Sequence, residues 1–328
     1  MQPAREAMMA IFSGKGKAER VPGHRAGHYH AMVFPGERYI KFPFDPYGTG
    51  PDSWNVLWTN LGPNPGIDGS MVAVGFKLFE DFAEWKEKVV FPDPEKQPLE
   101  QIFGAMEKGM HINREEDVIE VLLLSGQFER LNEMIGMEDA LCAFYDEPEL
   151  MHEWMDAMCE YKLKCIDLAA KYAHPDIIDL QDDWGAAKNM FFSPEIWREF
   201  IKPNEKKYAD RIHEHGMLYR HHSCGYVMQI VPDLVEIGVD ILEPVMICND
   251  MEWILDNYGD KICVAGGVDN QKIEHPNATE ETVIEEAHRC IDAYAKKGRY
   301  IPDFVATKAE VSKLFSEEVE RYGMNAFA

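Results

Sequence analysis

Hydrophobic positions from residue 115 onward alternate between two kinds of pattern. Short apolar runs, several of them bounded by Gly or Asp, predict strands, and longer segments with apolar residues every three or four positions predict helices. We expect strands at 118–124, 177–180, 217–222, 239–242, 262–265 and 299–301. We expect helices at 148–172, 194–215, 227–237, 250–258 and 280–297. This alternation predicts parallel β–α units.

The residues at the helix ends support these boundaries. Ser193 can cap a helix that begins with Pro194, and Gly298 follows two lysines as glycine often does at a helix C-terminus. No G-x-G-x-x-G run follows a predicted strand. The pattern therefore favours an α/β fold of the closed (β/α)₈ TIM-barrel type over a doubly wound dinucleotide-binding fold.

The first hundred residues follow a less regular pattern, rich in Pro, Gly and aromatic residues between 34 and 65. Such a segment cannot form a core alone, so we expect an N-terminal cap whose loops cover one mouth of the barrel. Trp54 and Trp58 are candidate walls of a substrate pocket there. Without repeats or a low-complexity linker, residues 1–328 are expected to form one barrel domain, of which residues 1–114 include the cap.

The amino-acid composition restricts the kinds of partner that the protein can bind and the compartment in which we expect it. The formal net charge of −25 repels phosphate backbones, which argues against nucleic acids and anionic membranes. No stretch approaches the roughly 20 apolar residues of a membrane span, and residues 1–20 lack the apolar core of a signal peptide. The 7 cysteines form no C-x-x-C pair, and an odd number suits a reducing compartment. We expect a cytoplasmic protein without disulfides.

The run His221-His222-Ser223-Cys224-Gly225 ends an apolar strand. Residues two apart in a strand point the same way, so His222 and Cys224 can direct an imidazole and a thiolate to one point. Zinc favours this pair of donors. The alternative is a packed strand end in which Cys224 acts as a small apolar residue. His221 points to the opposite face of the strand.

Several segments together resemble the uroporphyrinogen decarboxylase superfamily, and within it the corrinoid-dependent methyltransferases. They lie in this order at 179–185, 193–200, 222–225, 238–245 and 266–269. The resemblance implies a (β/α)₈ barrel with its site at the carboxyl ends of the strands. The true decarboxylases carry an arginine-rich segment near the N-terminus that binds the acidic side chains of a tetrapyrrole. Residues 21–28 of this chain lack that cationic cluster.

The methyltransferase branch implies a metal and a partner. In proteins of that branch, zinc held by His, Cys and usually a later Cys activates the methyl donor or acceptor, and a separate corrinoid protein presents cobalt over the barrel mouth. His222 and Cys224 match this pattern, whereas residues 299–303 contain no Cys or His. Carboxylates also bind zinc, so Glu243 and Asp303 are the candidate third ligands. We prefer Glu243, because its strand neighbours the strand of His222.

Other polar and aromatic residues complete the candidate site. Asp182 and Asp183 end a predicted strand at the catalytic face, where one of them could orient a ligating histidine, bind a substrate cation or cap the following turn. Gln181 is a candidate hydrogen-bonding partner. Trp184, with Trp54 and Trp58, is a candidate wall for a methoxylated ring or a methylammonium group.

A rival metal set has the spacing suggested for zinc in some aryl methyl ether demethylases that this family resembles. It comprises Glu138, Glu153 and His174, which lie on predicted helices or on the approach to a strand. That is the wrong end of a barrel for a site.

These features predict a zinc-dependent methyltransferase that moves a methyl group between a small methylated substrate and a corrinoid protein. An O-demethylase acting on a methyl ether is the preferred form, with a methylamine or a thiol as the other substrates. One alternative is a decarboxylase of a carboxylated small molecule, which requires a cationic cluster such as Arg25 and Arg38 beside Asp182. The other is a non-catalytic accessory protein that associates with a corrinoid or a metal.

Overall fold

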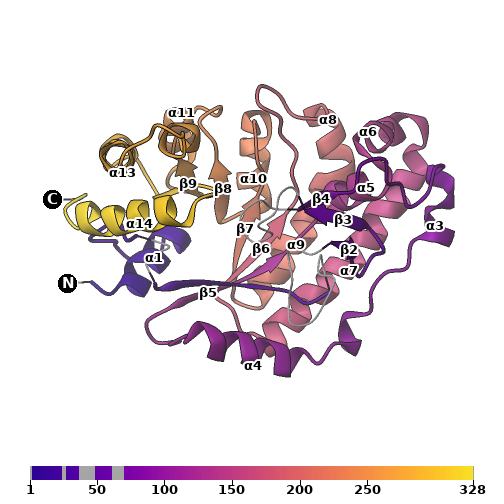
Figure 1. Cartoon of the computed structure of the whole chain (residues 1–328), viewed down its shortest axis with the longest axis horizontal. Helices are drawn as coiled ribbons and strands as arrows, with labels where there is room; N and C mark the ends of the chain where they lie inside the picture. The colour runs from indigo at the N-terminus through magenta and orange to yellow at the C-terminus, as the bar shows by residue number, and fades with distance from the viewer. Residues whose placement is uncertain (1, 24–26, 37–48, 61–69, 328) are drawn as a thin grey trace.

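A curled sheet of parallel strands forms the centre of the molecule (Figure 1). The computed structural model describes residues 2–23, 27–36, 49–60 and 70–327. Within these residues the sheet has seven strands, and their spatial order follows the chain: β1 (Tyr29–Val33), β5 (Val118–Leu123), β6 (Ile177–Gln181), β7 (Leu218–His222), β8 (Ile241–Val245), β9 (Cys263–Gly267) and β10 (Tyr300–Asp303). Sequential order and parallel pairing confirm the predicted TIM-barrel-like α/β fold.

Helices lie on the outer side of the sheet (Figure 1). They are α5 (Gln127–Ile135), α6 (Met137–Asp146), α7 (Pro148–Tyr172), α8 (Pro194–Ile196), α9 (Lys202–Glu214), α10 (Val231–Ile237), α11 (Met251–Tyr258), α12 (Asn270–Ile273), α13 (Glu280–Tyr294) and α14 (Ala309–Gly323). A π-helical turn (Trp197–Ile201) separates α8 from α9 inside the predicted helix 194–215. The change of bonding coincides with Pro203, which has no N–H to donate to the carbonyl of Glu199.

The amino-terminal end of the barrel is filled by α1 (Ala4–Ser13), which packs against β5, β9 and β10. Met8, Ile11 and Phe12 of α1 are buried in an apolar cluster with inward-pointing residues of five strands, Val118, Ile177, Ile241, Cys263, Ala265 and Ile301. Because this end is closed by apolar packing, polar chemistry is confined to the carboxyl-terminal half of the barrel interior.

The N-terminal segment contributes both to the barrel and to a separate small sheet. The prediction that it is irregular is wrong for β1, which pairs with β5 as a barrel strand. Its other elements are β2 (Gly50–Pro51), β3 (Leu57–Asn60), β4 (Ser70–Val72), α3 (Trp85–Lys88) and α4 (Leu99–Met110), and β2, β3 and β4 form an antiparallel sheet. The assignment of the whole chain to one domain stays a prediction.

A buried ion pair fastens the small sheet to the barrel. Asp52 accepts a hydrogen bond from Nε1 of Trp58 at 2.9 Å, and its Oδ2 lies 3.1 Å from Nη1 of Arg130 on α5. The Arg130 guanidinium also lies over the ring of Trp54, 4.9 Å from its centroid. Both tryptophans are therefore held in the contact between the cap segment and α5.

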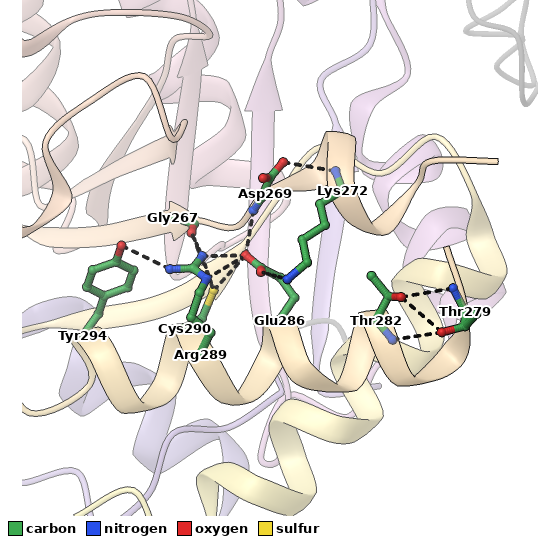
Figure 2. A network of polar contacts seen from close by, with 9 residues as sticks. All are labelled: Gly267, Asp269, Lys272, Thr279, Thr282, Glu286, Arg289, Cys290 and Tyr294. Atoms are coloured by element: carbon green, nitrogen blue, oxygen red, sulfur yellow. Dashed lines mark hydrogen bonds and ion pairs between the residues drawn. The ribbon is translucent and has the colours of Figure 1, made fainter. Parts of the chain in front are cut away.

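A second network fixes the loop after β9 to α13 (Figure 2). The buried carboxylate of Glu286 accepts the N–H of Asp269 and pairs with Lys272 and Arg289. The Asp269 carboxylate in turn accepts the N–H of Lys272, which caps α12. Asp269 is thus engaged in shaping this loop.

Among the described residues, no helix combines the length and the apolar character that a passage through a lipid bilayer requires.

Candidate metal centre

Three side chains with metal-binding atoms converge at the carboxyl ends of β6 and β7. Nε2 of His222 lies 3.6 Å from Sγ of Cys224 and 3.8 Å from Oδ1 of Asp183. One donor atom from each residue lies within 4.8 Å of the others, and all three side chains are partly exposed. Ligand atoms around a tetrahedral zinc ion lie about 3.5 Å apart. The nitrogen, sulfur and oxygen donors therefore fit the chemistry of zinc, and the distances of 3.6 and 3.8 Å from Nε2 are close to this spacing.

The loops after β6 and β7 lie so close together that Asp183 reaches Cys224. Oδ1 of Asp183 accepts the N–H of Cys224 at 2.7 Å, and Oγ of Ser223 accepts the N–H of Trp184 at 2.9 Å. Gly225 has a φ of +80°, and a Cβ added there would lie 2.2 Å from the carbonyl oxygen of Gly185. Glycine at position 225 is thus required by both its backbone conformation and the contact with the facing loop.

Glu243 contacts the other side of the His222 ring. Its Oε2 lies 2.7 Å from Nδ1 of His222, whereas Cys224 and Asp183 lie near Nε2. Burial by itself lowers the pKa of His222, but the charge of Glu243 and hydrogen bonds to Glu243 and Cys224 raise it well above its ordinary value. A carboxylate on the second ring nitrogen is the usual way in which a ligating histidine is oriented. The geometry thus places Glu243 behind the histidine, and not beside the cysteine.

Asp303 lies deeper in the barrel than the cluster of donors. Its Oδ2 is 3.0 Å from Nη2 of Arg220, and its Oδ1 accepts the N–H of Phe304 at 2.9 Å. Neither predicted third ligand therefore stands at Nε2 of His222. The structure brings Asp183 to that point instead.

Asp182 performs a different task from its neighbour Asp183. Its carboxylate accepts the N–H groups of Glu129 at 2.7 Å and of Phe128 at 3.2 Å, at the start of α5. Burial raises the pKa of Asp182 to about 7, although these backbone hydrogen bonds favour the charged form. Asp182 thus caps the start of α5, which is not the following turn considered for the pair, and Asp183 faces the histidine.

Of the predicted substrate-binding residues, Gln181 lies next to the centre and the three tryptophans are buried in packing contacts. Gln181 lies beside His222 in the strand register and donates to Asp179 at 2.9 Å. Trp184 is buried and stacks on the ring of His221, at 4.0 Å between centroids. It is held in packing contacts, as are Trp54 and Trp58. Arg25 and Arg38, which the decarboxylase alternative requires, lie outside the described residues.

The rival ligand set is not brought together. Glu153 and His174 stand near opposite ends of α7, which at 1.5 Å per residue puts them roughly 30 Å apart. Glu153 instead pairs with Lys86.

Beneath the cluster lies a layer of buried charged residues, of which the sequence reasoning singled out only Asp303. It consists of Glu120, Asp179, Arg220 and Asp303, each of which points into the barrel from a different strand. Burial raises the pKa of Glu120 to about 8 although Arg220 is close by, and burial also raises the pKa of Asp179. The signal for Glu120, Asp179 and Arg220 was available, because each lies inside a predicted strand, where a charged residue is unusual unless it is paired in the interior.

Comparisons with known proteins identify the family. Residues 82–304 match the model of the family described as Uroporphyrinogen decarboxylase (URO-D), which is more than half of the chain. The chain therefore belongs to this family.

A solved structure described as "methyltransferase from Methanosarcina mazei" is similar over 98% of this chain and 99% of that chain, with a TM-score of 0.70. At 13% sequence identity this likeness shows a shared fold. No curated protein matches the sequence.

The contact between the two loops predicts a difference between two glycine substitutions. Gly216 and Gly225 both have a positive φ, but a Cβ at Gly216 would meet no atom within 4 Å. Gly216→Ala should cost about 1–2 kcal/mol of unfolding free energy for its backbone conformation alone. Gly225→Ala should cost about 1–3 kcal/mol more, because it forces the loops apart. Urea unfolding of both variants measures this, and equal losses would contradict the proposed contact.

The buried Asp182 predicts a pH dependence of stability. Its pKa is about 7 in the folded protein and about 3.8 for an ordinary aspartate, so between these values the folded state binds more protons than the unfolded state. The contribution of Asp182 to the unfolding free energy therefore falls as the pH rises from 3.8 to 7, by about 4 kcal/mol at most. Asp182→Asn should remove this slope in urea unfolding measured from pH 4 to 8. Parallel curves for the variant and the wild type would refute the assignment.

Proposed function

We propose that this protein is a zinc-dependent methyltransferase that moves a methyl group between a small methylated substrate and a corrinoid protein. A methyl ether is the first-choice substrate, with a methylamine or a thiol next. The observation that carries the proposal is the meeting of His222, Cys224 and Asp183 at the carboxyl end of a barrel of the URO-D family. The proposal is also supported by the solved structure of the same fold that is described as a methyltransferase.

The buried charges favour this function over decarboxylation of a polyacid. Arg220 lies in the barrel interior, but its guanidinium is surrounded by Glu120, Glu243 and Asp303. Because these contacts already engage the guanidinium, Arg220 does not offer a substrate with several carboxylates the cationic group that such a substrate needs. A neutral ether or a cationic amine needs no such group.

Each residue of the centre has a defined part in this proposal. Zinc, when bound, would act as a Lewis acid that stabilises the atom from which the methyl group departs, or that favours the thiolate of a thiol acceptor. His222 would bind through Nε2, Cys224 through Sγ and Asp183 through a carboxylate oxygen. Glu243 holds the proton of Nδ1, so that Nε2 is the nitrogen left for the metal. Bound zinc would require Nε2 of His222 without a proton and Cys224 in its thiolate form.

Zinc affinity tests the proposed ligands. We expect the wild type to bind zinc and the variants His222→Ala, Cys224→Ser and Asp183→Ala to lose affinity by more than the 10- to 100-fold typical of losing an orienting partner. Glu243→Gln should fall within that 10- to 100-fold range, because it disturbs only the orientation of the ring. Competition with a chromophoric chelator gives the dissociation constants.

The control is His213→Ala, which alters a histidine that pairs with Asp240 away from the centre and should leave the affinity unchanged. Full affinity in the three ligand variants would rule out the centre. A larger loss in Glu243→Gln than in Asp183→Ala would make Glu243 the third ligand.

Methyl transfer tests the reaction itself. Zinc-loaded protein should convert cob(I)alamin, as a substitute for the partner's cofactor, to methylcobalamin when a methoxylated phenol is supplied. The methyl–oxygen bond breaks with its electron pair left on oxygen, and cobalt(I) supplies the pair of the new bond. The absorbance change reports the reaction, with Cys224→Ser as the inactive control. No transfer from an ether or an amine, and none from methylcobalamin to a thiol, would favour the accessory-protein alternative.

A further inference from the structure

We propose that Arg220 is a positioning residue for the metal centre, which it serves by holding Glu243 against the His222 ring from inside the barrel. The inference rests on the proposed function as far as zinc is concerned. Its geometric part concerns only residues of this chain.

Arg220 lies on the same face of β7 as His222, because the two residues are two positions apart in the strand. Its guanidinium is buried and contacts groups from four other strands. Nη1 donates to the hydroxyl of Tyr29 on β1 at 2.9 Å, and Nη2 lies 3.0 Å from Oδ2 of Asp303 on β10. Nε lies 3.4 Å from Oε1 of Glu120 on β5. These contacts hold the guanidinium in one place.

The fourth contact connects this fixed cation to the centre. Nη2 of Arg220 lies 3.4 Å from Oε2 of Glu243, and the same oxygen lies 2.7 Å from Nδ1 of His222. One carboxylate oxygen is thus shared between the guanidinium below and the imidazole above. Because the ring is held at Nδ1, its Nε2 is directed toward Cys224 and Asp183. Arg220 therefore acts on the centre through Glu243.

The contacts also explain why this position holds arginine. β1 and β10 are the edge strands of the described sheet, and Arg220 joins Tyr29 on one to Asp303 on the other. A planar guanidinium offers separate donors in several directions, whereas a lysine ammonium is a compact charge that cannot reach all of these groups at once. Lysine would keep the positive charge among the carboxylates but would release some of its partners.

The test is the variant Arg220→Lys, with Arg130→Lys as a matched control. Arg130 is also a fully buried arginine between two carboxylates, those of Asp52 and Glu133, but it lies in the contact with the cap segment. Both variants retain charge and should lose stability. We expect only Arg220→Lys to weaken zinc binding, by about 10- to 100-fold, and Arg130→Lys to stay within about threefold of the wild type.

A crystal structure of metal-free Arg220→Lys supplies a readout that does not depend on zinc. We expect the hydrogen bond between Glu243 and Nδ1 of His222 to be broken or lengthened beyond 3.5 Å. The inference is overturned if that bond is unchanged, or if both variants bind zinc equally well. If the wild type binds no zinc, the proposed function fails, and the crystal structure still decides whether Arg220 positions Glu243.

A milder change covers the case in which Arg220→Lys does not fold. Tyr29→Phe removes the hydroxyl that accepts a hydrogen bond from Nη1 of Arg220 and that also contacts Glu120. It should weaken zinc binding in the same direction, by threefold or more, and a wild-type affinity in this variant would count against the inference.

Discussion

The hydrogen bond between Glu243 and Nδ1 of His222 determines which ring nitrogen faces the carboxyl end of the barrel. An imidazole has two nitrogens, and the group bound to one of them determines which is left for chemistry. With Nδ1 held from below, Nε2 lies between a thiol and a carboxylate at spacings that suit zinc. The remaining features of the site serve to keep this ring in place or to bring the other two donors to it.

The barrel interior has an apolar layer at its amino-terminal end and a layer of buried charged residues above it. At the amino-terminal end, α1 fills the space with apolar side chains. Above it, Arg220 contacts Glu120, Glu243 and Asp303, and burial raises the pKa of Glu120. Buried ions are costly unless they are paired, so such a layer is expected to persist only where it supports something else. Here the layer supports the His222 ring, because Oε2 of Glu243 contacts both Arg220 and Nδ1 of His222.

The sequence predicted six of the barrel strands and five of the helices after residue 115, because those elements follow hydrophobic periods. It did not predict α5, α6, α12 or α14. It did not predict β1, since Tyr29 and His30 interrupt the apolar character by which a buried strand is recognised. In the site, the spacing of His222 and Cys224 was enough to propose that they act together, because period two is a local property of strands. The choice between Asp182 and Asp183 depends on which one the start of α5 reaches, and the place of Glu243 depends on ring orientation. Both are tertiary contacts that no local pattern encodes.

A crystal structure of the zinc-loaded protein, with anomalous scattering recorded at the zinc edge, tests the central claim most directly. The account predicts a zinc ion bound by Nε2 of His222, Sγ of Cys224 and a carboxylate oxygen of Asp183, with Glu243 still on Nδ1. A zinc ion bound elsewhere, or one bound to Glu243 with the ring turned over, would contradict it.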